Sequence, residues 1–285
     1  MVLRLDPRFP LVWRTPHSLQ LGVDRPGVVL EDLSEEQERL LAALLSGISR
    51  SGLEMMAGAA GVDGLEEFLD RIRPALASDE SVPAGGAVTL VGAGPTAEGI
   101  GELLRRSGLA LVPDGRKTGL VIIVAHYVIE PELHGRWLRR DLPHLPVVFG
   151  DSVVRIGPVV EPGTGPCLYC LDRYRRDADP VWPAIASQLW GRRSAAETAV
   201  VAVEVAAVAA RIVLARLAAE RPGRATSVEL DVGSGEAVLR HWQPHPECGC
   251  IRISAAPRGT GRASSARRGQ MHPVPRTDAA AGARG

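Results

Sequence analysis

Gly165-Pro166-Cys167-Leu168-Tyr169-Cys170 and Cys248-Gly249-Cys250 are the stretches that decide the fold, because they hold all four cysteines of the 285-residue chain. A C-x-x-C pair places two thiolates on one turn, and a C-x-C pair can do the same at a strand end. Together they supply the four ligands of a tetrahedral zinc site. The 77 residues between the pairs make such a site a clamp across a domain. We therefore predict a zinc ion held by Cys167, Cys170, Cys248 and Cys250.

Two disulfides or four buried, unpaired thiols are the alternatives to zinc. The N-terminus shows no secretory signal, which disfavours disulfides. A redox C-x-x-C would not need a second cysteine pair. Four cysteine ligands leave no open position for water, so the predicted site is structural and not catalytic.

The composition indicates a soluble protein with two modest domains. Hydrophobic residues make up 45% of the chain, the formal net charge is zero, and Lys117 is the one lysine beside 32 arginines. The most apolar predicted helix, 195–219, carries four charged residues that a membrane span rarely tolerates. We expect a buried core helix there, a cytoplasmic protein and no membrane partner.

Residues 1–83 are predicted to form a small winged-helix-like module. Three short strands are expected at 11–14, 18–21 and 28–30. A capping box, Ser34-Glu35-Glu36-Gln37, opens the first of three short helices. Strands followed by three helices favour this assignment.

The charge of this module points to a peptide and not to nucleic acid. Residues 1–83 contain 8 arginines and 14 acidic residues, a balance of −6, whereas a DNA-binding module needs a basic surface. An extended peptide can instead add to the edge of a sheet as a further strand. The side chains predicted to line pockets beside that edge are Leu19, Leu21, Phe68 and Ile72. A dimerisation or packing appendage is the alternative.

A glycine loop follows a predicted linker at 81–86. The buried strand 87–91 runs into Gly92-Ala93-Gly94-Pro95-Thr96-Ala97 and then into a helix, which is the setting of a nucleotide-binding G-x-G-x-x-A fingerprint. Gly92, Gly94 and Ala97 would hold a nucleotide, and Asp114 lies where a ribose-binding acid is expected. Asp114 also fits an ordinary turn, Pro113-Asp114-Gly115.

The connection after the second strand of this domain is unusually short. Only a few residues separate the strand at 109–112 from the apolar strand at 119–124, whereas a parallel crossover needs a dozen or more. We predict that the second β-α-β unit is missing or replaced by a hairpin.

The rest of the chain leads to the second cysteine pair. A capping box, Ser194-Ala195-Ala196-Glu197, is expected to open the long apolar helix. A hairpin at 226–231 and 237–242 then delivers the chain to Cys248. His241 and His245 are expected beside the metal ligands or at the surface. Residues 255–285, with 6 arginines and 1 aspartate, are predicted to be disordered.

This order of elements resembles the ThiF-type superfamily, which includes relatives of ubiquitin-activating enzymes. Those proteins use the glycine loop for ATP and carry a four-cysteine zinc clamp. The resemblance covers residues 87–253. It implies an α/β fold with a Rossmann-like ThiF-type domain at 84–254. With the winged-helix-like module predicted at 1–83 and the predicted tail at 255–285, the chain would have three parts. The Asn-Arg-Gln-like segment and catalytic lysine of adenylating members are absent, and Ala125-His126-Tyr127 stands where they place a magnesium-binding Asp.

A narrower resemblance is to the degenerate Ocin-ThiF-like proteins, carried by the acidic N-terminal module and by the run that begins Pro166-Cys167-Leu168-Tyr169-Cys170. It implies a non-catalytic scaffold that binds a precursor leader peptide and presents it to a YcaO-type cyclodehydratase in azole-modified peptide biosynthesis. The alternatives are an active ATP-dependent adenylyltransferase acting on a C-terminal carboxylate and a nucleic-acid-binding regulator. The sequence also leaves a homodimer and passive ATP binding open.

Overall fold

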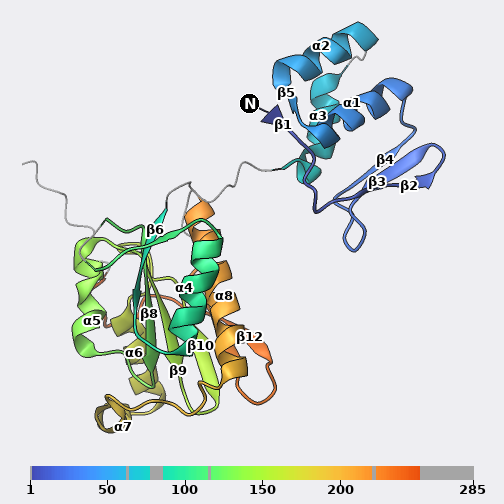
Figure 1. Cartoon of the computed structure of the whole chain (residues 1–285). Coiled ribbons are helices and arrows are strands. Elements are labelled where there is room, and N and C mark those ends of the chain that lie inside the picture. Colours follow the sequence, from blue (N-terminus) through green and yellow to red (C-terminus); the bar gives the residue numbers. More distant parts are fainter. Residues whose placement is uncertain (1, 62–63, 78–85, 115–116, 220–222, 251–285) are drawn as a thin grey trace, which may run out of the picture.

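A computed structural model describes residues 2–61, 64–77, 86–114, 117–219 and 223–250 (Figure 1). The predicted tail at 255–285 and nearly all of the predicted linker at 81–86 lie outside these residues. The parts on either side of residues 78–85 are described separately. The domain boundary at 83/84 stays a prediction.

The N-terminal part is a small sheet with three helices. Strands β2 (Leu11–Thr15), β3 (Ser18–Leu21) and β4 (Val28–Glu31) form an antiparallel sheet in that order, and β1 (Val2–Leu3) pairs with β5 (Ile48–Ser49). Helices α1 (Glu35–Ser46), α2 (Arg50–Ala60) and α3 (Leu65–Ile72) follow, and a 3-10 turn, η1 (Arg73–Ala75), ends this part. The predicted strands and helices are confirmed, while the winged-helix assignment itself stays a prediction.

Local sequence signals explain why these elements form. The Ser34 hydroxyl accepts from the Gln37 amide and the Gln37 side chain accepts from the Ser34 amide, so the predicted capping box is confirmed. Alternating strand residues and one face of each helix then form a single buried cluster, which includes Leu21, Leu44 and Ile72.

The C-terminal part is built on a seven-stranded sheet in the order β12-β11-β10-β9-β8-β6-β7. Strands β6 (Ala87–Val91), β7 (Ala110–Leu111), β8 (Leu120–His126) and β9 (His144–Phe149) are parallel. Strands β10 (Val153–Ile156), β11 (Thr226–Asp231) and β12 (Ala237–His241) continue the sheet antiparallel, which confirms the predicted C-terminal hairpin.

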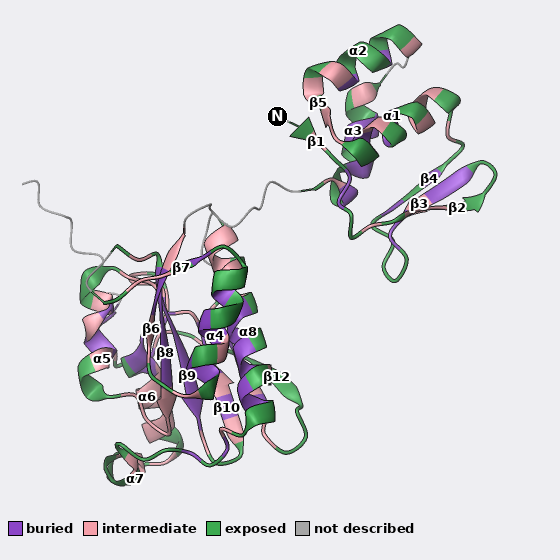
Figure 2. Ribbon diagram, viewed as in Figure 1, coloured by how far each residue is buried: buried purple, intermediate pink, exposed green. Residues whose placement is uncertain are grey.

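Helices cover both faces of this sheet, which is why its central strands are the most buried part (Figure 2). Helices α4 (Pro95–Arg106) and α8 (Ala199–Ala218) pack together on one face, over Leu120, Ile122 and Val124 of β8. The opposite face packs Val121 and Ile123 against the cysteine-bearing segment. The elements on that side are α5 (Pro131–Arg136), η2 (Leu138–Arg140), α6 (Leu168–Ala178) and α7 (Trp182–Leu189).

Of the two predicted alternatives, the hairpin between β7 and β8 is wrong, whereas the missing second β-α-β unit is confirmed for the described residues. Both strands pair parallel with β6, which lies between them. Leu111 and Leu120 both stand opposite Val88, so β7 ends level with the start of β8. The chain therefore needs no helical return, and the described residues between these strands contain no helix.

Helix α8 is a core helix, as expected from an apolar segment whose charged residues disfavour a membrane span. One side of it, including Val205, Ala209 and Val213, is buried in the main core. Across the described ranges no helix has the length and apolar character that crossing a membrane requires.

Candidate functional site

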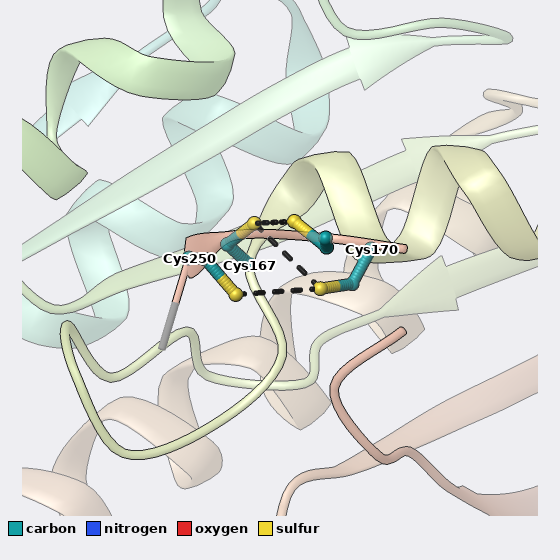
Figure 3. Close-up of side chains that lie close together, drawn as sticks. Cys167, Cys170 and Cys250 are labelled. Carbon is teal, nitrogen blue, oxygen red and sulfur yellow. Dashed lines mark hydrogen bonds between the residues drawn. The ribbon is translucent and has the colours of Figure 1, made fainter. Parts of the chain in front are cut away.

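The four cysteines converge from two distant segments. Cys167 is the N-cap of α6 and Cys170 lies in its first turn, while Cys248 and Cys250 follow β12. The sulfur atoms of Cys167 and Cys170 are 3.8 Å apart, those of Cys167 and Cys248 3.7 Å, and those of Cys170 and Cys250 3.6 Å (Figure 3). All four sulfurs lie within 4.8 Å of one another, and all four thiols are free of disulfides.

This spacing fits a metal ion. Zinc–sulfur bonds of about 2.3 Å in a tetrahedron place neighbouring sulfurs about 3.8 Å apart, whereas a disulfide would bring two of them to about 2.0 Å. The four cysteines can therefore hold a metal such as zinc. Since all four positions would be taken by protein ligands, the arrangement suits a structural ion.

The cysteines differ in acidity. A hydrogen bond from the Cys167 thiol lowers the pKa of Cys170 to about 4, and the same contact raises the pKa of Cys167. Burial raises the pKa of Cys250 to about 11. A cation that binds here would compensate the negative charge of the thiolates and so favour deprotonation of all four cysteines.

A set of polar contacts fixes the second cysteine pair against α6. His245 is buried, its Nε2 lies 2.7 Å from an Asp177 carboxylate oxygen, and its Nδ1 accepts from the Glu247 amide. The Cys248 amide donates to the His245 carbonyl, and Arg173 and Arg176 both reach Glu247. The hydrogen bond from His245 Nε2 to the Asp177 carboxylate lowers the pKa of Asp177. Sequence reasoning placed His245 beside the site but gave no sign of the partners on α6.

His241 lies away from this cluster. Its Nδ1 is 2.9 Å from the Thr226 hydroxyl across the β11–β12 hairpin, and the residue is exposed.

The glycine loop has the backbone that its sequence predicts. Gly92 and Gly94 have φ of +116° and +114°, a region that favours glycine. A Cβ at Gly92 would collide with the Val124 carbonyl, so the loop and the end of β8 are in close contact. Ala97, in the first turn of α4, is buried. The loop therefore delivers the N-terminus of α4 to the carboxyl edge of the parallel strands, where anions bind in this kind of fold.

The chain's own carboxylate occupies that anion position. Glu197 Oε1 accepts from the Thr96 amide at 3.2 Å, in the first turn of α4. Both Glu197 oxygens lie 3.1 Å from where a Cβ on Gly94 would be, beside the Arg193 guanidinium. Only 4% of the Glu197 side chain is exposed. The amide that would meet a phosphate thus already has an anionic partner.

The predicted capping box at Ser194–Glu197 is wrong, because Glu197 accepts from the Thr96 amide of α4 and does not cap α8. Helix α8 begins at Ala199, and its N-cap is Thr198, whose hydroxyl accepts from the Val201 amide. The Ser194 hydroxyl donates to the Gly150 carbonyl instead. A tertiary contact with α4 takes Glu197 away from the local role that its spacing indicated.

Two further side chains surround the Glu197 carboxylate. Arg193 Nη2 lies 2.6 Å from Oε2, and His126 Nε2 lies 3.6 Å from the same oxygen. Burial tends to raise the pKa of Glu197, but hydrogen bonds from Thr96 and Arg193 outweigh it and lower that pKa. Burial also lowers the pKa of His126, whose Nδ1 accepts from the Ser194 amide. The glycine loop thus contains a compensated internal charge cluster that the sequence did not reveal.

Asp114 is engaged elsewhere. Its carboxylate pairs with Arg136 of α5 and, at 2.7 Å, with Arg140 of η2. These contacts join the end of β7 to the helical segment after β8. The assignment of Asp114 to a ribose stays a prediction, and in this structure both of its oxygens already have cationic partners.

The four predicted peptide-pocket residues lie in the core. Leu19, Leu21, Phe68 and Ile72 are between 0 and 3% exposed. The strand alternation and the apolar face of α3 turn them inward, so their placement at the surface needs correction. The partly exposed face of the small sheet carries Val12, Gln20 and Val29, which share one register row.

No model of a known protein family matches the chain, and no curated protein sequence matches it either. Solved structures do match. The heterocyclase TruD has a TM-score of 0.62 at 16% identity, over 94% of this chain and 45% of TruD. A heterocyclase in complex with substrate and cofactor has a TM-score of 0.61 at 18% identity, over 88% of this chain and 39% of that one.

E. coli MccB with MccA has a TM-score of 0.59 at 10% identity, over 88% of this chain and all of MccB. A related structure describes MccB as a microcin C7 biosynthetic enzyme. The chain spans less than half the length of the two heterocyclases. These likenesses establish the fold, and the predicted ThiF-like resemblance is confirmed at that level.

We expect each purified chain to contain one divalent metal ion, and Cys170→Ser to lose it. The unfolding free energy should fall by more than about 5 kcal/mol, because binding of structural zinc contributes on the order of 10 kcal/mol to small domains. Elemental analysis and chemical unfolding measure both quantities. Thr164→Ser, which keeps all four thiols, is the control. Metal-free wild-type protein with unchanged stability would contradict the assignment.

We expect Glu197→Gln to destabilise the protein by about 2 kcal/mol at pH 7, because it removes the charge-assisted hydrogen bonds that the buried Glu197 carboxylate accepts from Thr96 and Arg193. Since the pKa of Glu197 is lowered in the folded state, its contribution is complete above the usual carboxyl pKa of about 4.3. It is lost as the pH falls through the folded value. Urea unfolding of variant and wild type from pH 7 to pH 3 should show the difference shrinking. Glu98→Gln, exposed on α4, is the control, and a difference that grows toward low pH would refute this.

Proposed function

We propose that this chain is a non-catalytic peptide-binding partner in the biosynthesis of azole-modified peptides. It binds the leader of a precursor peptide through its N-terminal part and presents the peptide to a YcaO-type cyclodehydratase. The observation that carries the non-catalytic half of the proposal is the Glu197 carboxylate at the Thr96 amide. The fold shared with heterocyclases and with a microcin C7 biosynthetic enzyme supports the pathway.

Adenylation would require ATP at the glycine loop. The triphosphate is highly negative, and its reaction needs magnesium and cationic groups that compensate the developing charge. Here Glu197 adds a negative charge at that position, and His126 stands at the end of β8 where adenylating relatives are expected to place an Asp. Arg193, the nearest cation, is already paired with Glu197 at 2.6 Å.

An active adenylyltransferase is the second candidate function. MccB, which shares the fold, has a structure with ATP. For this chain to bind ATP at the glycine loop, Glu197 would have to move away from the Thr96 amide. Arg193 would then either move with Glu197 or lose its ion pair with it. That rearrangement separates a buried carboxylate from three partners, which is costly.

The open edge of β4 is the site we propose for the leader peptide. Among the described residues β4 pairs only with β3, so its other edge is available to an extended segment. Val29 is 39% exposed on this strand and lies in one row with Gln20 and Val12. Main-chain hydrogen bonds to β4 would give affinity, and contacts with this face would give sequence preference.

The acidic balance of residues 1–83 supports a peptide partner over DNA. On the outer sheet face Arg14 and Glu31 already neutralise one another at 3.8 Å, so no cationic stripe is left along these strands. A peptide with basic residues suits such a surface, whereas a phosphate backbone does not.

Zinc is the metal that we propose for the cysteine cluster. Four thiolates are soft ligands that select zinc over magnesium or calcium. The ion would hold the segment after β12 on α6 and contribute no chemistry of its own. Cys167, Cys170, Cys248 and Cys250 are its ligands in this proposal.

We expect the full-length chain to bind the leader of an azole-modified peptide's precursor with roughly micromolar affinity. Val29→Asp should weaken binding tenfold or more, because it replaces an apolar contact surface on β4 with a hydrated carboxylate. Trp13→Asp, a matched exposed change on β2 at the opposite edge, should change it less than threefold. Fluorescence anisotropy with a labelled peptide measures these affinities.

Duplex DNA at low salt serves as the competing ligand in the same assay. Salt-sensitive binding of DNA with no response to peptide would overturn the proposal and favour a regulator. A larger loss of affinity for Trp13→Asp than for Val29→Asp would place the peptide at the β2 edge and contradict the proposed β4 site.

A further inference from the structure

A pocket on the sheet face opposite α4 and α8 has no role in the function proposed above. Its volume is about 310 Å³, and it lies between β9, α6 and α7. Its walls are mainly apolar, and include Ile129, Val148, Leu168, Trp190 and Trp242. No cysteine and no residue of the glycine loop lines it. The size is at the lower end of small-molecule sites, which range from about 300 to 1,000 Å³.

One cation in this pocket has few partners. The Arg175 guanidinium donates one hydrogen bond, at 3.3 Å, to the Tyr127 carbonyl and stacks 5.2 Å from the Trp182 ring centre. It has no ion pair within the described part of the chain. Burial, followed by the charge of Arg155, lowers the pKa of Arg175 to about 10, which still leaves it charged at neutral pH.

The neighbouring carboxylates, Asp172 and Glu229, favour the charged form of Arg175 and so raise its pKa, but neither forms an ion pair with it in the described part of the chain. Asp172 accepts from the Trp182 indole at 3.0 Å, and Arg155 is held by Glu229 at 3.2 Å. Burial lowers the pKa of His134, which favours its neutral form. A guanidinium with several unused donors in an apolar pocket is costly unless an anion meets it.

We propose that this pocket binds a carboxylate carried on a small apolar body, such as an aromatic ring. The planar guanidinium matches a carboxylate in two parallel hydrogen bonds, and the apolar walls accommodate the ring. A phosphate dianion fits less well, because Asp172 lies on the same wall and Arg155 is already neutralised by Glu229. This site is separate from the proposed leader-peptide edge, so either proposal can fail alone.

The test uses phenylacetate as the probe, with the full-length protein. Phenylacetamide, which has the same shape without the charge, and phenyl phosphate are the comparison ligands. We expect phenylacetate to bind with a dissociation constant on the order of 1 mM, as suits so few atoms, and both comparison ligands to bind at least tenfold more weakly. Ligand-observed NMR and tryptophan fluorescence measure this binding.

Two pairs of variants locate the site. Arg175→Gln should weaken phenylacetate binding tenfold or more, whereas Arg211→Gln, exposed on α8, should leave it unchanged. Ser187→Trp should abolish binding by filling the pocket, and it decides the question independently of how Arg175→Gln folds. Gln188→Trp, beside it on α7 but outside the pocket lining, is its control. Equal binding of phenylacetate and phenylacetamide, or full binding by Ser187→Trp, would overturn the proposal.

Discussion

The hydrogen bond from the Thr96 amide to Glu197 joins the three elements on which the C-terminal part depends. Thr96 lies in the first turn of α4, Glu197 directly precedes α8, and His126 ends β8 beside them. A helix N-terminus carries unsatisfied amides and a positive dipole end, so it needs an acceptor. Here the acceptor belongs to the chain. The same contact therefore ties the segment before α8 to α4 and gives the Thr96 amide an anionic partner.

The cysteine cluster performs a comparable task at the other face of the sheet. It joins α6 to the segment after β12 across 77 residues. His245 and Glu247 also bind side chains of α6, and these contacts hold the segment in place without a metal ion. Both constraints stabilise a ThiF-like fold without providing reactive groups. Both constraints are consistent with the binding role that we propose, in which the N-terminal sheet is the surface for the peptide.

Much of the fold could be predicted from local patterns. Buried strands such as 119–124, the capping box at Ser34 and the C-terminal hairpin follow from periodicity and turn chemistry, and the cysteine spacing pointed to one cluster. Predictions failed where a tertiary contact competed with a local one. The Ser194–Glu197 spacing matches a capping box, yet α4 provides Glu197 with a buried amide. The end of the short strand β7 lies level with the start of β8, and the number of residues between the two strands could not show this. Leu19, Leu21, Phe68 and Ile72 were identified as apolar positions, but their periodicity indicates core and not a surface pocket.

In the function that we propose, the glycine loop does not support adenylation. The most direct measurement is ATP–pyrophosphate exchange with the full-length protein, magnesium and the precursor peptide. We expect no exchange above the level without protein, because Glu197 already accepts from the Thr96 amide and His126 stands where adenylating relatives are expected to place a magnesium-binding Asp. Sustained exchange that depends on the peptide and is abolished by Gly94→Trp would contradict it.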